Sequence, residues 1–483
     1  MKLKKLFENE SNIEITNLTT DSRLARKGSL FFCIEGVTQD RHDYIDDAIS
    51  NGAVAIVHSK DVEKVPGVVY IQVNDVYDHL ERVSGIFYDD PSHKMSVIGV
   101  TGTNGKSTVT STLRHVLNRL NSKTGYVGTI SIEYGDVVLE PSLTTPDVIE
   151  MHDILNEMVK DDVENAALEV SSQGLDMRRV DTIDFDIAVF TNLSSEHMDY
   201  HKDLEDYFQA KKRLFDILKP EGTMILNIDD PYGKRLYDMD YPQKKISISL
   251  ESGADYEVRD LVLREDHTSF TLKHQNISYP VTTNMLAKFN VYNLVQVIAT
   301  VHELGHPLDS ILPLVIDLPE VKGRVNMIDK GQNFKAVVDY SHTPDGFEKI
   351  YQYLRSITPG KLITVYGNAG GRDTTKRSIM GKISDTYCDY IVITEQDRRN
   401  EDVSQIKDMM VKDIKNTPYT FIEKRYDAID YALKHAQEGD TVVILGKGDE
   451  RFQHGPNGKE DWMGDDEAVK TILEQMMHVK FEV

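Results

Sequence analysis

Apolar residues in the first part of the chain gather in short runs separated by segments with helical spacing. Runs at residues 28–34, 53–58 and 68–73 have the length of buried strands. Strands that alternate with helices are typical of α/β proteins. The turn-forming sequence Asp89-Asp90-Pro91-Ser92 follows them. We therefore predict an α/β domain over residues 1–95.

The pattern restarts with an apolar strand at residues 96–100, which runs directly into a glycine loop. Apolar residues between positions 113 and 120 then recur at helical spacing. Two more strand-like runs, 165–170 and 187–192, each end in a polar cluster, and ligand sites of open α/β sheets lie at such strand ends. We predict a central domain over residues 96–320, built on a parallel sheet like that of P-loop ATPases.

The last part of the chain repeats the alternation of strands and helices. The predicted strands are residues 336–340, 362–367, 390–394 and 441–446. This pattern favours a Rossmann-like, doubly wound domain over residues 321–483. The fold class is therefore α/β with three domains.

Composition and charge narrow the class of protein. The 483 residues are 40% hydrophobic and 28% charged, which is typical of globular proteins. A net charge of −24 argues against nucleic acid or an anionic membrane as a partner, because both repel such a surface. Neither a signal peptide nor an 18-residue apolar run is present, and only two cysteines, Cys33 and Cys388, occur. We expect a cytoplasmic monomer without membrane insertion.

The strongest chemical signal is the sequence from Thr101 to Thr108, which lies between a strand and a helix. Its glycines let backbone N–H groups approach phosphate oxygens, and the following helix start favours negative charge. Lys106 can neutralise phosphates and Ser107 can bind Mg²⁺. The loop departs from the strict phosphate-loop pattern because Val100 takes the place of its first glycine. The predicted ATP-binding residues here are Gly102, Thr103, Asn104, Gly105, Lys106, Ser107 and Thr108.

This loop resembles the ATP loop of the Mur ligase family, which includes the folylpolyglutamate synthetases. Other strings resemble family motifs and follow in the family's order. They are Leu168-Glu169-Val170-Ser171-Ser172, Thr191-Asn192-Leu193, His197-Met198-Asp199-Tyr200-His201, Ala210-Lys211, Phe289-Asn290-Val291-Tyr292-Asn293, Gly323-Arg324, Asp339-Tyr340-Ser341-His342-Thr343-Pro344 and Gly446-Lys447-Gly448. The resemblance covers the whole chain.

Within the family, the chain looks closest to the UDP-N-acetylmuramoyl-tripeptide synthetases. Thr20-Asp21-Ser22-Arg23 and the segment from Gly36 to His42 resemble the UDP-binding region of that type, although Arg41 replaces a glycine. Thr144-Thr145-Pro146 matches the loop that holds the muramoyl dipeptide. A folate-elongating ligase should lack the first two features.

The resemblance implies a catalytic centre with metal ions. It implies Mg²⁺ at two sites, with Ser107, Glu169, His197 and a carbamylated Lys211 as ligands, and Lys106, His197 and Lys211 as catalytic residues. Carbamylation would turn a cation into a carboxylate-like ligand beside the phosphates.

The resemblance also implies where the two larger substrates bind. Asn290 would contact adenine, Arg324 the ATP phosphates and Asp339 the ribose. The residues expected to bind the UDP-muramoyl dipeptide are Ser22, His42, Thr144, Thr145, Ser171 and Arg179.

The incoming amino acid is less clearly encoded. Arg399 stands where diaminopimelate ligases have the arginine of Asp-Asn-Pro-Arg, but the asparagine and proline of that motif are absent. After Gly446, Asp449 and Glu450 would suit an extra ammonium group, as on L-lysine. We slightly favour L-lysine over meso-diaminopimelate.

The function implied is ATP-dependent addition of a diamino acid to the D-glutamate side-chain carboxylate of UDP-N-acetylmuramoyl-L-Ala-D-Glu through an acyl phosphate, in peptidoglycan synthesis. One alternative is a folylpolyglutamate or poly-γ-glutamate ligase. The segment around Ser22 argues against this alternative. Another alternative is a nucleotide-regulated binding protein without ligase activity. The presence of Lys211 argues against it.

Overall fold

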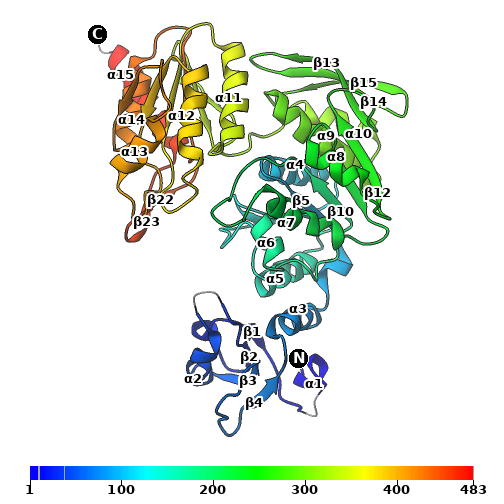
Figure 1. Ribbon diagram of the computed structural model, residues 1–483. Helices are drawn as coiled ribbons and strands as arrows, with labels where there is room; N and C mark the ends of the chain where they lie inside the picture. Colours follow the sequence, from blue (N-terminus) through cyan, green and yellow to red (C-terminus); the bar gives the residue numbers. More distant parts are fainter. Residues whose placement is uncertain (9–10, 37–38, 482–483) are drawn as a thin grey trace. The chain divides into compact units, whose positions relative to one another are not determined.

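The computed structural model describes residues 1–8, 11–36 and 39–481 (Figure 1). The chain forms two compact units, each described by itself. The first unit contains residues 1–99, 121–188 and 213–222, and the second contains residues 100–120, 189–212 and those from 223 onward. The chain passes between the units within β5 (Ser96–Thr101), β10 (Ile187–Phe190) and α7 (Leu204–Asp216).

The N-terminal part of the first unit is a four-stranded parallel sheet in sequential order, β1-β2-β3-β4. Both faces of β2 are buried, because Leu30 and Phe32 lie in one apolar cluster while Phe31 and Cys33 lie in another. The strands are β1 (Asn17–Thr19), β2 (Ser29–Phe32), β3 (Ala53–His58) and β4 (Val69–Gln72), and the helices are α1 (Leu3–Leu6), α2 (Ile45–Ser50) and α3 (Val76–Phe87).

The rest of the first unit contains a mixed sheet. β6 pairs in parallel with β9 and antiparallel with β7, which pairs antiparallel with β8. The elements are β6 (Thr124–Val127), β7 (Ile132–Tyr134), β8 (Val137–Leu139), α5 (Val148–Lys160), β9 (Asn165–Glu169) and α6 (Ser172–Asp176).

The second unit begins with α4 (Lys106–Arg119), which packs against α9 (Lys288–Glu303). Beside them, β11, β12 and β13 are parallel, whereas β13, β14 and β15 form an antiparallel meander that was not predicted from the sequence. The elements are β11 (Thr223–Asn227), α8 (Pro231–Asp238), β12 (Lys244–Ser249), β13 (Tyr256–Leu263), β14 (Thr268–His274), β15 (Ile277–Thr283) and α10 (Leu308–Ile311).

The C-terminal part of the second unit is doubly wound, as predicted. Its sheet has the order β16-β17-β21-β18-β19-β20, and all neighbouring strands are parallel except β16, an antiparallel edge strand. The strands are β16 (Asn326–Ile328), β17 (Lys335–Asp339), β18 (Leu362–Tyr366), β19 (Tyr390–Ile393), β20 (Tyr419–Phe421) and β21 (Thr441–Leu445).

Helices cover both faces of this sheet. One apolar cluster contains residues of α11, α12 and α13, and a second contains residues of α14 and α15. The helices are α11 (Pro344–Ile357), α12 (Lys376–Tyr387), α13 (Val403–Val411), α14 (Arg425–His435) and α15 (Asp465–Phe481), and a hairpin of β22 (Phe452–Gly455) and β23 (Gly458–Asp461) precedes α15. Every strand predicted from an apolar run is present. Among the described residues, no helix is both long and apolar enough to span a membrane.

Candidate functional site

The glycine loop between β5 and α4 needs its glycines for steric reasons. Gly102 and Gly105 have φ values of 148° and 92°, which disfavour a side chain. A Cβ atom on Gly102 would lie 1.9 Å from Oγ1 of Thr191, and one on Gly105 would lie 2.4 Å from Oδ1 of Asn293. The backbone of this loop is therefore packed too closely for any other residue.

The neighbouring segment holds the loop by hydrogen bonds. The N–H of Thr103 donates to the Asn192 carbonyl at 2.8 Å, and the N–H of Asn104 donates to Oδ1 of Asn192 at 3.0 Å. Lys106 bends back over the loop, where its Nζ donates to the carbonyls of Gly102 and Thr103, each at 2.9 Å. Its ammonium group thus lies at the start of α4, where phosphate binding is favourable. Ser107 and Thr108 are buried in the first turn of this helix.

Lys211 on α7 reaches the same loop. It is 1% exposed, and its Nζ donates to the Gly102 carbonyl at 2.8 Å and lies 4.4 Å from the centre of the Tyr207 ring. Burial, and next the charge of Lys106, hold the pKa of Lys211 well below its usual value. A deprotonated amine is nucleophilic, so the environment suits reaction with carbon dioxide.

His197 is the second predicted metal ligand near the loop. Burial is the main reason that its pKa falls to about 4, although the neighbouring Glu196 opposes this shift. A neutral imidazole is the form that binds metal ions. In the part of the chain that the structure describes, no three His, Cys, Asp or Glu side chains converge as a metal site. A site here would therefore use other groups, such as the Ser107 hydroxyl and a carbamate.

Glu169 lies in the first unit, at the end of β9. Its Oε1 accepts hydrogen bonds from the Tyr126 hydroxyl at 2.7 Å and the Thr129 N–H at 3.0 Å, and it is 1% exposed. These bonds hold the carboxylate in one orientation. Its shared ligation with Ser107 and Lys211 stays a prediction.

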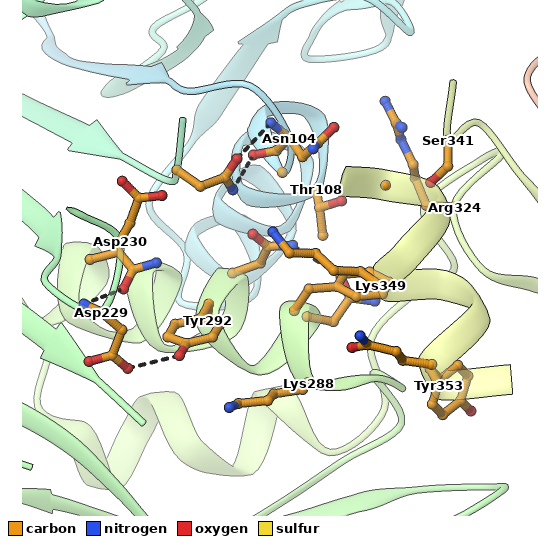
Figure 2. A pocket seen from close by; sticks show the side chains of 18 of the residues that line it. Asn104, Thr108, Asp229, Asp230, Lys288, Tyr292, Arg324, Ser341, Lys349 and Tyr353 are labelled. Atoms are coloured by element: carbon orange, nitrogen blue, oxygen red, sulfur yellow. Dashed lines mark hydrogen bonds between the residues drawn. The ribbon is translucent and has the colours of Figure 1, made fainter. Parts of the chain in front are cut away.

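A cavity of about 570 Å³ in the second unit adjoins the glycine loop (Figure 2). Its volume is in the usual range for a small-molecule site. The predicted ATP-binding residues that line it are Asn104, Gly105, Thr108, Asn290, Arg324 and Asp339. The cavity brings together residues that are distant in sequence.

Several lining residues were missed by the sequence analysis. The Tyr292 hydroxyl donates to Oδ2 of Asp229 at 2.8 Å on one side of the cavity, and Lys349 extends into it from α11 (Figure 2). Tyr292 lies within a quoted family string, but Asp229 and Lys349 carried no recognisable local signal.

The cavity residues Asn290, Arg324 and Asp339 are held in different ways. Asn290 donates to the Leu286 carbonyl at 2.9 Å, just before α9, and Arg324 stacks 4.6 Å from the centre of the Tyr340 ring. Asp339 accepts hydrogen bonds from the N–H groups of Val325 and Ser341. It therefore connects the segment before β16 to the segment after β17.

Four of the predicted muramoyl-dipeptide residues lie together in the first unit. The Thr145 hydroxyl donates to the Glu169 carbonyl at 2.9 Å and accepts from the Ser171 N–H at the same distance. Arg179 donates to the Thr145 carbonyl at 3.0 Å, and Thr144 is hydrogen-bonded to Thr129.

The two predicted UDP-binding residues lie in the N-terminal sheet region. Ser22 begins a 3₁₀ turn and is buried. Both ring nitrogens of His42 are engaged, with Asp40 at 2.6 Å and the Ser59 N–H at 3.1 Å. The predicted segment from Gly36 to His42 includes Val37 and Thr38, which lie outside the described residues.

The residues predicted to bind the incoming amino acid are in the C-terminal part of the second unit. The Arg399 guanidinium donates to the Gly370 carbonyl at 2.8 Å, and no carboxylate among the described residues forms an ion pair with it. Glu450 is paired with the buried Lys447 and accepts from the Tyr340 hydroxyl at 2.9 Å. Lys447 also contacts Asp397 at 3.1 Å.

Gly446 and Asp449 also belong to the predicted amino-acid site. Gly446 has a φ value of 108°, and a Cβ atom there would lie 2.2 Å from Gln396 Oε1. Burial raises the pKa of Asp449. The charges of Asp449 and Glu450 are therefore less available to an incoming ammonium group than the sequence pattern suggests.

Comparisons with known proteins agree with this arrangement. Residues 14–91 match the family described as "Mur ligase family, catalytic domain", residues 100–301 match "Mur ligase middle domain", and residues 323–448 match "Mur ligase, glutamate ligase domain".

Relatives align over nearly the whole chain. A protein of Clostridium acetobutylicum, named UDP-N-acetylmuramoyl-L-alanyl-D-glutamate--2,6-diaminopimelate ligase 1, is 38% identical over 94% of this chain and 95% of its own. A ligase of the same name, without the number, from Alkaliphilus metalliredigens is 38% identical over 94% of each chain. A solved structure with that name is 27% identical, has a TM-score of 0.69 and covers 99% of both chains.

Proposed function

This chain belongs to the Mur ligase family, and we propose that it adds a 2,6-diamino acid to the D-glutamate side-chain carboxylate of UDP-N-acetylmuramoyl-L-alanyl-D-glutamate at the expense of ATP. The observation that carries the proposal is the cavity beside the glycine loop. Lys106 folds back over that loop, and Asn290 and Arg324 line the cavity. We also propose the domain boundaries near residues 95 and 320.

The proposed reaction has two steps. The carboxylate attacks the γ-phosphorus of ATP, so that an acyl phosphate forms and ADP leaves. The amine of the incoming amino acid then attacks the acyl carbon, loses a proton, and the tetrahedral intermediate expels inorganic phosphate. Lys106 and Arg324 would neutralise the charge of the phosphate oxygens during transfer.

The environment of Lys211 supports a role in holding a metal ion. Its neutral amine can attack carbon dioxide, forming a nitrogen–carbon bond and releasing a proton, which leaves a negatively charged carbamate. We propose that Mg²⁺ binds at two sites, with this carbamate, Ser107 and His197 as ligands in the second unit and Glu169 as a ligand in the first unit. Bound Mg²⁺ would add positive charge beside the phosphates.

We propose that six residues of the first unit bind the UDP-muramoyl dipeptide. Thr145, Ser171 and Arg179 are joined by hydrogen bonds close to Glu169, which supports a shared dipeptide subsite. For Ser22, Thr144 and His42 the support is the resemblance alone.

For the amino acid we propose 2,6-diaminopimelate in preference to the L-lysine that the sequence pattern slightly favours. The names of the relatives support this choice. So do the local charges, because Glu450 is already compensated by Lys447 while Arg399 has no carboxylate partner among the described residues. A guanidinium in this state suits the second carboxylate of diaminopimelate.

Phosphate release tests the proposal. The protein should release inorganic phosphate from ATP when UDP-N-acetylmuramoyl-L-alanyl-D-glutamate and meso-diaminopimelate are both supplied, and much less when L-lysine replaces diaminopimelate. Binding of ADP without release with either amino acid would contradict the ligase and favour a nucleotide-regulated binding protein.

A further inference from the structure

Glu196 is a buried carboxylate that the proposed reaction leaves without a role. Its side chain is 8% exposed, and its Oε1 lies 2.7 Å from Nε2 of His342, a residue 146 positions away in the sequence. Its other oxygen lies 3.8 Å from Nε2 of His197. A carboxylate removed from water is costly unless it is paired, so these contacts define its position.

Basic side chains surround Glu196 at the glycine loop. They are those of Lys106, His197, Lys211, His342 and Lys376. Glu196 thus lies between the glycine loop and the segment that follows β17, which contains His342.

His342 holds that segment by more than one bond. Its Nδ1 donates to the Tyr340 carbonyl at 3.0 Å, and its own carbonyl accepts from Nζ of Lys376 at 2.9 Å. The hydrogen bond from Nε2 of His342 to Glu196 is charge-assisted, because its acceptor is a carboxylate.

The same segment carries nucleotide-cavity residues. Ser341 lines the cavity, and the Tyr340 ring supports the Arg324 guanidinium at 4.6 Å. A shift of His342 would therefore be transmitted to Tyr340 and to the arginine stacked on it.

We propose that Glu196 is a positioning residue for nucleotide binding, which acts through His342 to hold Ser341 and Arg324 in place relative to the glycine loop. This inference rests on the proposed function to the extent that the cavity binds ATP. Glu196 itself need not touch the nucleotide. Its contribution should therefore appear in nucleotide affinity, also without a metal ion.

The test is ADP binding to the full chain, measured by calorimetry with EDTA and again with Mg²⁺. Glu196→Gln keeps the shape but removes the charge, and His342→Leu removes the donor of the same bond from its more exposed side. Each variant should bind ADP about tenfold more weakly under both conditions, because a charge-assisted bond is lost. The double variant should be no weaker than the single ones.

Glu257→Gln is the matched control. Glu257 is 7% exposed at its side chain and is paired with Arg259 at 2.5 Å, but it does not line the cavity. This variant should bind ADP as the unmodified protein does. A thermal melt of each variant would show whether the fold is retained, and His342→Leu keeps the test valid if Glu196→Gln does not fold.

Three outcomes would overturn the inference. They are unchanged ADP affinity in both single variants, additive losses in the double variant, and a loss that occurs only with Mg²⁺, which would make Glu196 a metal ligand. Failure of the proposed function is distinguishable, because an unmodified protein that binds ADP without releasing phosphate would contradict ligation and leave the Glu196 result unaffected.

Discussion

Asn104 in the glycine loop donates from Nδ2 to Oδ2 of Asp345 at 3.1 Å, although 241 positions separate the two residues. The same oxygen accepts from Nζ of Lys349, one helical turn further along α11, at 2.8 Å. One carboxylate therefore connects the loop to α11 and orients a lysine that lines the cavity beside the glycine loop.

Lys349→Met should weaken ADP binding about three- to tenfold, because the cavity loses a cation near the phosphates. Calorimetry at low and high salt would measure the effect, which should shrink as salt screens the charge. Lys434→Met is the matched control, since Lys434 pairs with Asp430 at 2.8 Å with the same spacing on α14. Equal affinity in both variants would mean that Lys349 only stabilises its helix.

Lys211→Met should lower phosphate release about 100-fold or more, because the side chain keeps its approximate length but cannot form a carbamate. The unmodified protein should show a carbamate signal by ¹³C NMR in labelled bicarbonate at neutral pH, since burial keeps the pKa of Lys211 low. Lys212→Met, at the next position, is the control and should retain activity. Full activity of Lys211→Met would refute the carbamate.

Arg399→Met should reduce kcat/KM for meso-diaminopimelate about 30- to 100-fold, since the distal carboxylate would lose its guanidinium partner. The KM for ATP should stay nearly constant. Arg398→Met removes the neighbouring guanidinium and should have a much smaller effect. Similar losses in the two variants would argue against a specific contact by Arg399.

We predict that the stability of the first unit depends on pH because the pKa of Glu81 is raised. Burial, opposed by the charge of Arg178, raises the pKa of Glu81 to about 7. The folded state therefore binds more protons than the unfolded state between the ordinary pKa of this carboxyl and about pH 7. Stability from this group is present at low pH and is lost as pH rises through that window.

The comparison with Glu81→Gln isolates this effect. Relative to the variant, the free energy of unfolding of the unmodified protein should fall by roughly 2 kcal/mol between pH 5 and pH 8. Urea unfolding would measure the difference. Arg178 keeps its ion pair with Asp78 at 2.6 Å in the variant. A difference that is independent of pH would contradict the prediction.

The local elements and the glycine loop could be predicted from the sequence because their causes are contiguous in the chain. Gly102 and Gly105 adopt the positive φ values that such a loop requires, and the apolar runs of β2 and β21 are buried as expected. The antiparallel meander of β13, β14 and β15 was missed. Buried and less buried residues alternate throughout β14 but only in part of β13 and β15, so the pairing of these strands depends on their neighbours.

The meeting of distant side chains could not be predicted from the sequence, because it depends on how the elements pack. Glu196 and His342 carry no mutual signal in the sequence, and neither do Asn104 and Asp345, because hydrogen bonds at 2.7 Å and 3.1 Å depend on how the strands and helices pack. The structure likewise decided that Glu450 is paired with Lys447 while Arg399 lacks a carboxylate among the described residues. The sequence was sufficient to predict the strands of the α/β regions, the glycine loop and the family resemblance. The sequence could not show which charged side chains are available to a ligand. Packing determines this, because burial and pairing neutralise some of these charges.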